Sequence, residues 1–246
     1  MNDLSLQDIR AAYEGMEIVQ EWERRYYPDR ERRLLQRTIA RLGRLRTALD
    51  VGGGIGLHAS LLREYVALVY HLDFSWTMCS YAKRRFCLDS VQGNALQLPF
   101  KTETFDLTIT YGVSTFVRSE AWRIQTVAEM VRVTKLGGFV IISTANGDGI
   151  WAVLKRNRDL HLIDSADERL IARMGLQRVR RLYGNLAPPI FYRISALAPV
   201  GRFIDLVAGQ NRFFSRQKTV VFQKLYPADN LIAIDTKGIE EKGSLR

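Results

Sequence analysis

The sequence contains few of the residues that characterise several other classes of protein. Its 246 residues include only two cysteines and three histidines, too few for a disulfide-rich secreted domain. No apolar run reaches the roughly 18 residues of a membrane-spanning helix, and Met1 to Leu4 lack the basic flank and hydrophobic region of a signal peptide. We therefore expect a cytoplasmic protein, and its hydrophobic fraction of 47% suffices for the core of one large domain.

The most informative segment is Thr47 to Gly56, which reads T-A-L-D-V-G-G-G-I-G. An apolar run ends in Asp50 and is followed by glycines at positions 52, 53, 54 and 56. Because glycine has no Cβ, it lets a strand turn sharply into a helix and lets backbone N–H groups approach a ligand. The segment from Gly54 to Ala59 also has the G-x-G-x-x-A form of a dinucleotide site. The loop alone therefore leaves the nucleotide cofactor open.

The residues after this loop follow the pattern of a doubly wound sheet. Leucines recur at helical spacing from Leu57, and Val66 to Leu72 is a short apolar run typical of a buried strand. Asp73 comes directly after that run. An acid at this strand end can accept two hydrogen bonds from ribose hydroxyls. The sequence thus predicts a nucleoside-binding edge.

Several stretches in the expected order resemble one enzyme family. The pattern of Asp50 and the following glycines resembles the first motif of the class I S-adenosylmethionine (SAM) methyltransferases. Four later stretches are similar to motifs of the small-molecule methyltransferases of ubiquinone and menaquinone synthesis: Asp73 to Met78 (D-F-S-W-T-M), Gly93 to Phe100 (G-N-A-L-Q-L-P-F), Phe105 to Thr110 (F-D-L-T-I-T) and Val133 to Gly138 (V-T-K-L-G-G).

The resemblance covers residues 45 to 145. It implies an α/β fold with a doubly wound, mostly parallel, seven-stranded Rossmann-like sheet, and SAM as the cofactor. It assigns cofactor binding to Asp50, Gly52, Gly53, Gly54, Gly56, Asp73, Phe74, Met78, Asn94, Ala95 and Tyr111. Phe74 is expected to flank the adenine. Asn94 replaces the family's usual aspartate and keeps one carbonyl acceptor for the adenine amino group.

We expect one methyltransferase domain over residues 1–225 and a C-terminal tail over 226–246. Within the domain, residues 1–44 form a helical cover, 45–145 the cofactor-binding core and 146–215 an acceptor-side region. In the cover, apolar residues at helical spacing from Ile9 to Val19 predict a first helix, and a second is predicted from Pro28 to Gly43. Since such helices cover the cofactor in the family, Tyr13, Tyr26 and Tyr27 are candidates for the SAM or substrate pocket; the alternative is that they pack with a hydroxyl at the surface.

Positive charge is concentrated in the C-terminal part of the chain. Residues 151–224 hold 14 Lys and Arg against 5 Asp and Glu, whereas residues 1–150 hold 19 against 17. After the fifth strand, helices are predicted over 151–158 and 165–174 and a strand over 176–183. Residues 185–215 then form a long apolar and arginine-bearing insertion before a last strand at 219–223. We interpret the insertion as a substrate cover, because long connections in compact domains are usually functional.

Methyl transfer asks mainly for alignment, because the sulfonium already activates the methyl group. An oxygen nucleophile also needs a base. His161 and Asp148 are the candidates, because both follow the fifth strand, where substrate-facing loops gather. The other histidines, His58 and His71, are expected to be structural or to border the cofactor. No paired-acid metal site of the catechol methyltransferase kind is present, so no metal is expected.

These observations favour methyl transfer to a small or lipid-like acceptor, with peripheral contact to a membrane. The main alternative is an RNA methyltransferase that uses the basic C-terminal region, although no known RNA-binding module is recognisable and no N-P-P-Y-type tetrapeptide follows Asp106. A nicotinamide-dependent dehydrogenase and a non-catalytic SAM-binding protein are more distant alternatives. A solvated basic face would explain the charge without any partner.

Overall fold

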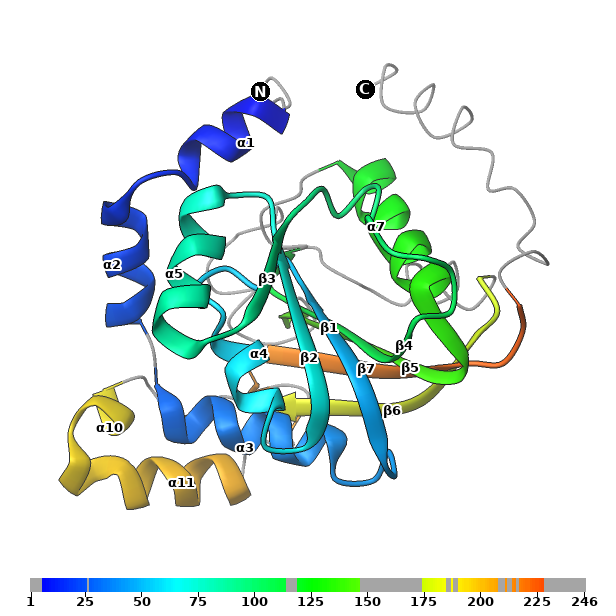
Figure 1. Cartoon of the computed structure of the whole chain (residues 1–246). Coiled ribbons are helices and arrows are strands. Elements are labelled where there is room, and N and C mark those ends of the chain that lie inside the picture. Colours follow the sequence, from blue (N-terminus) through cyan, green and yellow to red (C-terminus); the bar gives the residue numbers. More distant parts are fainter. Residues whose placement is uncertain are drawn as a thin grey trace, which may run out of the picture.

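The computed structural model describes residues 6–25, 27–113, 119–146, 174–184, 187, 190–207, 211, 214–215 and 217–227. Helices and strands alternate along most of this length (Figure 1). The helices are α1 (Leu6–Ala12), α2 (Met16–Arg24), α3 (Pro28–Ile39), α4 (Leu57–Leu62), α5 (Trp76–Phe86), α7 (Glu120–Val133), α10 (Ile190–Arg193), the 3₁₀ helix η2 (Ser195–Leu197) and α11 (Ala198–Val207). The strands are β1 (Leu45–Val51), β2 (Val66–Asp73), β3 (Asp89–Gln92), β4 (Phe105–Tyr111), β5 (Thr134–Ala145), β6 (Leu176–Gly184) and β7 (Gln217–Lys224).

The strands form a seven-stranded sheet in the order β3-β2-β1-β4-β5-β7-β6. Strands β1 to β5 pair in parallel, and β7 runs antiparallel to both of its neighbours. The predicted doubly wound, mostly parallel seven-stranded sheet is therefore confirmed. In the register, Val51 lies opposite Leu72. The glycine loop after β1 and Asp73 at the end of β2 consequently meet at one edge, the usual ligand-binding edge of such sheets.

Helices cover both faces of the sheet, and the strands alternate between two cores as the pleat requires. In β7, Val220 and Phe222 pack in the core beneath α7, whereas Val221 packs with α3, α4 and α5 on the other face. In β1, Leu49 and Ala48 divide in the same way. Burial on both faces explains why these strands read as continuous apolar runs.

The N-terminal cover differs from its prediction. A single helix over residues 9–19 was wrong, because the chain breaks between α1 and α2 at Gly15, which has φ +112°. Such a backbone angle lies outside the helical region and favours glycine. The second helix begins at Pro28 as predicted but ends at Ile39, short of Gly43.

The insertion between β6 and β7 contains the helices α10, η2 and α11. These lie beyond α3, at the lower left of Figure 1. Strands are predicted correctly near both ends of the insertion, although β7 is longer than expected. The helices expected over 151–158 and 165–174 lie outside the described residues, apart from Met174. None of the helices in the described part of the chain is long and apolar enough to cross a membrane.

Candidate functional site: a cavity at the carboxyl ends of the strands

The glycine loop turns between β1 and α4 without room for side chains. A Cβ added to Gly53 would lie 2.4 Å from Cδ2 of His71 and 2.7 Å from Oδ2 of Asp50. Gly56, which caps α4, has φ +83°, and a Cβ there would lie 2.6 Å from that of Ala82. All three distances are too short for real Cβ contacts. The sequence places glycines here because the loop packs directly on α5 and β2.

Asp50 and His71 hold the glycine loop and the start of α4 by hydrogen bonds to backbone groups. Asp50 Oδ2 accepts a hydrogen bond from the backbone N–H of Ala59 at 3.0 Å, and burial raises the pKa of Asp50 to about 6. Burial also lowers the pKa of His71 to about 4, so the neutral ring donates from Nε2 to the Gly54 carbonyl at 3.0 Å. Neither residue lines the cavity described below, and neither does Gly56. The structure thus gives Asp50 and Gly56, both predicted to bind the cofactor, contacts that shape the loop.

Asp73 is fixed at the edge of the sheet by two backbone N–H groups. Gly54 N donates to Oδ2 at 2.8 Å and Ser75 N donates to Oδ1 at 2.9 Å. Burial raises the pKa of Asp73. Each oxygen of an ionised carboxylate has two acceptor positions. The carboxylate therefore keeps acceptor capacity for a ligand hydroxyl beside its bonds to the backbone.

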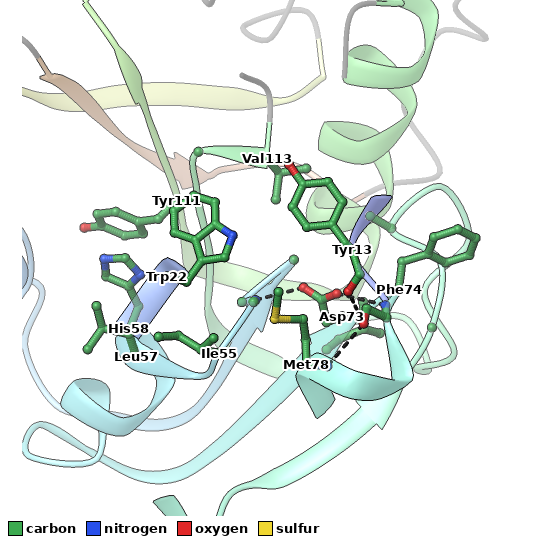
Figure 2. Close-up of a pocket in the computed structure, with 18 of the residues that line it drawn as sticks. Tyr13, Trp22, Ile55, Leu57, His58, Asp73, Phe74, Met78, Tyr111 and Val113 are labelled. Carbon is green, nitrogen blue, oxygen red and sulfur yellow. Dashed lines mark hydrogen bonds between the residues drawn. The ribbon is translucent and has the colours of Figure 1, made fainter. Parts of the chain in front are cut away.

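Most of the predicted cofactor residues line one cavity of about 270 Å³ (Figure 2). These are Gly52, Gly53, Gly54, Asp73, Phe74, Met78, Asn94, Ala95 and Tyr111. Tyr13 and Phe74 lie beside Asp73 at one end, and His58, Tyr111 and Trp22 lie together at the other. The structure thus brings together the glycine loop after β1 and residues of β2, β4 and the N-terminal helices.

At the Asp73 end, the N-terminal cover is tied to α5. Ser75 Oγ donates to the Tyr13 carbonyl at 2.8 Å. The Glu14 carboxylate accepts from Trp76 N at 3.0 Å and from Thr77 N at 3.1 Å, and so caps α5. Burial opposes ionisation of Glu14, but the hydrogen bonds from Thr77, Trp76 and Ser75 outweigh it and lower the pKa of Glu14 to about 2. These contacts hold Tyr13 over the cavity, as expected from the sequence.

At the opposite end, His58 and Glu31 form an ion pair inside the cavity. His58 Nε2 lies 3.1 Å from Glu31 Oε2, with side chains only 17% and 16% exposed. The His58 ring stacks on Tyr111 with a centroid distance of 4.1 Å. Burial lowers the pKa of His58, but Glu31 and the charge of Asp50 outweigh it, so that the pKa is raised. Burial would raise the pKa of Glu31, but His58 outweighs it and the pKa is lowered. Each group therefore favours the charged form of the other.

Asn94 lies on the wall near Phe74, and its acceptor is already in use. Its Oδ1 accepts a hydrogen bond from Leu96 N at 2.9 Å. The same oxygen keeps a second lone pair that faces no described donor. An adenine amino group that donates to Asn94 would therefore share this oxygen with the backbone N–H of Leu96.

The two predicted catalytic residues, Asp148 and His161, lie outside the described residues. Sequence reasoning also missed part of the cavity wall, namely Arg10, Trp22, Arg25 and Glu31. Trp22 follows buried Val19 by three positions on α2, a helical spacing that signals the inner face of a helix. Glu31 carried no such signal, because an acid in the first turn of a helix is explained by the helix dipole alone.

Comparison with known proteins supports the resemblance seen in the sequence. Residues 49–142 match the family model described as a methyltransferase domain. A demethylmenaquinone methyltransferase from Halalkalibacterium halodurans is 39% identical over 105 residues, which cover 39% of this chain and 41% of that protein. A probable tRNA methyltransferase 9B from Homo sapiens is 30% identical over 109 residues, covering 44% of this chain and 22% of that protein. The chain thus spans less than half the length of these relatives.

Solved structures agree in fold. A SAM-dependent methyltransferase from Thermotoga maritima superposes with a TM-score of 0.61 at 18% identity, covering 85% of this chain and 97% of that one. The N-methyltransferase NodS from Bradyrhizobium japonicum, in complex with S-adenosyl-L-homocysteine, gives a TM-score of 0.57 at 16% identity, covering 79% and 86%. At such identities the likeness concerns the fold. Residues 49–142 thus match a methyltransferase domain, and the seven-stranded sheet has the fold of these solved methyltransferases.

Proposed function

We propose that the protein transfers the methyl group of SAM to a small or lipid-like acceptor by in-line displacement. The observation that carries the proposal is the cavity, in which predicted cofactor residues of the glycine loop, β2 and β4 face one space beneath an N-terminal cover. The acceptor's nucleophile attacks the methyl carbon, the carbon–sulfur bond breaks, and S-adenosylhomocysteine leaves as a neutral thioether. The chain's own task is to align the reactants and exclude water.

The proposed cofactor contacts follow the order of the strands. Asp73, whose carboxylate keeps acceptor capacity beside its bonds to the backbone, receives the ribose hydroxyls. Phe74 flanks the adenine, whose amino group donates to Asn94. The glycine loop approaches the methionine part, at the end of the cavity where His58 and Glu31 lie. No pyrophosphate is required by this arrangement, in contrast to a nicotinamide site.

A lipid-like acceptor is supported by the apolar part of the wall. Trp22, Ile55, Leu57, Met78 and Val113 line the cavity and offer no charge to an acceptor. The quinone substrate named for the Halalkalibacterium relative belongs to the same chemical class. We therefore propose a quinone-like or other apolar acceptor, a cytoplasmic location and peripheral contact with a membrane, where such an acceptor resides.

The acceptor can be identified by supplying SAM with a library of phenolic, sugar and quinone compounds while S-adenosylhomocysteine release is measured. We expect release with apolar phenols or quinones. Release with RNA alone, together with salt-sensitive RNA binding, would favour the second candidate, an RNA methyltransferase. That candidate is supported by the basic charge of residues 151–224 and by the tRNA methyltransferase relative.

The proposed base is His161, with Asp148 as the second candidate. If His161 removes a proton from an oxygen nucleophile, His161→Ala should lower turnover by roughly 10² to 10⁴ with SAM affinity unchanged. A fully active variant would leave Asp148 or alignment without a base. Titration with SAM separates loss of chemistry from loss of cofactor.

A further inference from the structure

Helix α11 presents apolar side chains to the outside of the molecule. Phe203, Leu206 and Val207 are 65%, 64% and 66% exposed, and Val200 is 47% exposed. Their spacing of three and four residues places them on one face of the helix. A surface helix in a globular domain normally turns this face inward. The outward face of α11 thus consists of apolar residues without a described partner.

The inward face is held by polar contacts that fix the orientation of the helix. Asp205, 6% exposed, accepts hydrogen bonds from Ala187 N at 2.9 Å and from the Tyr192 hydroxyl at 2.6 Å. Its backbone carbonyl accepts from the Arg37 guanidinium of α3 at 3.4 Å. Rotating α11 to bury its apolar face would break these bonds. The apolar face is therefore built to point outward.

Two arginines accompany this face, and one of them forms an ion pair with Asp29, whose side chain is 49% exposed. Arg193 at the end of α10 is exposed, and the Arg202 side chain is 42% exposed at 3.5 Å from Asp29 of α3. The acid in residues 190–207 is Asp205, which is buried. An apolar face edged by arginine is the pattern of helices that lie in the headgroup region of a bilayer. Two copies of this face would instead bring their arginines together and repel.

We propose that the outward face of α11, formed by Val200, Phe203, Leu206 and Val207, binds the surface of an anionic lipid bilayer. Figure 1 shows α10 and α11 beyond α3, at an end of the molecule where a flat surface can reach them. The apolar side chains enter the acyl boundary, and Arg193 and Arg202 meet the lipid phosphates. The purpose of this contact rests on the proposed lipid-like acceptor. The contact itself does not require methyl transfer.

Co-sedimentation with vesicles tests this surface without SAM or acceptor. The whole chain should bind vesicles of phosphatidylglycerol and phosphatidylcholine more tightly than vesicles of phosphatidylcholine alone, and less tightly as salt is added. The double variant Phe203→Ser/Leu206→Ser should bind at least about tenfold more weakly, because binding scales with the apolar area that enters the bilayer. A matched control, Leu68→Ser/Leu136→Ser, changes leucines that are 55% and 52% exposed elsewhere and should bind as the wild type does.

Three results would overturn the proposal: no binding to anionic vesicles, equal binding by the Phe203/Leu206 variant, or equal loss in the control. Sedimentation velocity adds a fourth, a wild-type dimer that the Phe203/Leu206 variant dissociates, which would assign the face to a second copy. Titration of each variant with SAM checks that the cofactor site is intact. Failure of the methyltransferase proposal would appear in that titration, and failure of the bilayer proposal would appear with the vesicles.

Discussion

The cofactor edge of the sheet and the α11 segment distribute polar and apolar residues in opposite ways. At the cofactor edge, apolar residues such as Leu49 are fully buried, and polar groups such as Asp73 collect around a cavity. In α11, the buried residues include Asp205, and the exposed ones include Phe203 and Leu206. The first arrangement is stabilised by the core and recognises a polar cofactor. The second leaves apolar side chains exposed to water, which indicates an interaction site for an apolar partner.

The largest expected difference between the two regions is the loss of stability when one leucine in each is replaced by alanine. Leu49→Ala should lower the free energy of unfolding by about 2–5 kcal/mol, because the Leu49 side chain is 0% exposed and its removal leaves a cavity in the core. Leu206→Ala should change it by less than about 0.5 kcal/mol, since that side chain is already 64% exposed. Urea unfolding of both variants measures the contrast. Equal losses would mean that α11 is covered in solution.

The His58–Glu31 pair should make the stability of the cofactor edge depend on pH. His58→Gln should cost about 2–3 kcal/mol below neutral pH, less than for a fully buried pair because both side chains keep some exposure. The folded pKa of His58 is raised above its ordinary value of 6.5. The stabilisation is therefore fully present near pH 6.5 and is lost as the pH rises through the folded pKa.

Unfolding of the wild type and of His58→Gln, measured from pH 6 to 10, checks this expectation. The two curves should converge at alkaline pH. A gap that widens with pH would mean that His58 is neutral in the folded protein. Glu64→Gln, which changes an acid in a more exposed ion pair with Arg32, should show little effect.

Asp73→Ala should weaken SAM binding by roughly 1–3 kcal/mol, because the ribose hydroxyls lose their acceptors. The fold should remain intact by circular dichroism. Asp89→Ala, at an exposed acid on neighbouring β3, serves as the control and should bind SAM normally. Unchanged affinity in a folded Asp73 variant would remove this residue from the site.

The smallest expected effect concerns the cap on α5. Glu14→Ala should lower the free energy of unfolding by about 0.5–2 kcal/mol, since two backbone N–H groups lose their acceptor. The pKa of Glu14 is lowered from 4.5 to about 2. Its stabilisation is therefore present above pH 4.5 and lost as the pH falls toward 2. Glu17→Ala, at an exposed position of α2, should cost less at every pH.

Local chemistry explains which features could be predicted from the sequence. The glycine loop and Asp73 were predicted because a tight turn and a strand end each restrict the residue type within a few positions. The break at Gly15 was missed because its cause is Glu14 capping α5, a contact between residues more than 60 positions apart. The His58–Glu31 pair likewise joins α3 to α4.

The insertion between β6 and β7 also has a feature that the sequence could not predict. Its helices α10 and α11 carry apolar residues at helical spacing. The pattern gave no orientation for α11, because spacing identifies a face without saying which way it points. That orientation depends on Asp205, Tyr192 and Arg37, which meet only in the folded chain.

Calorimetric titration of the wild-type protein with SAM, and separately with NADH, tests the central claim most directly. The glycine loop and Asp73 are compatible with either nucleotide on geometry alone, so the two titrations discriminate between them. We expect SAM to bind at one site per chain, to be displaced by S-adenosylhomocysteine and to lose affinity in Asp73→Ala, while NADH gives no saturable heat. Tight binding of NADH without binding of SAM would contradict the account.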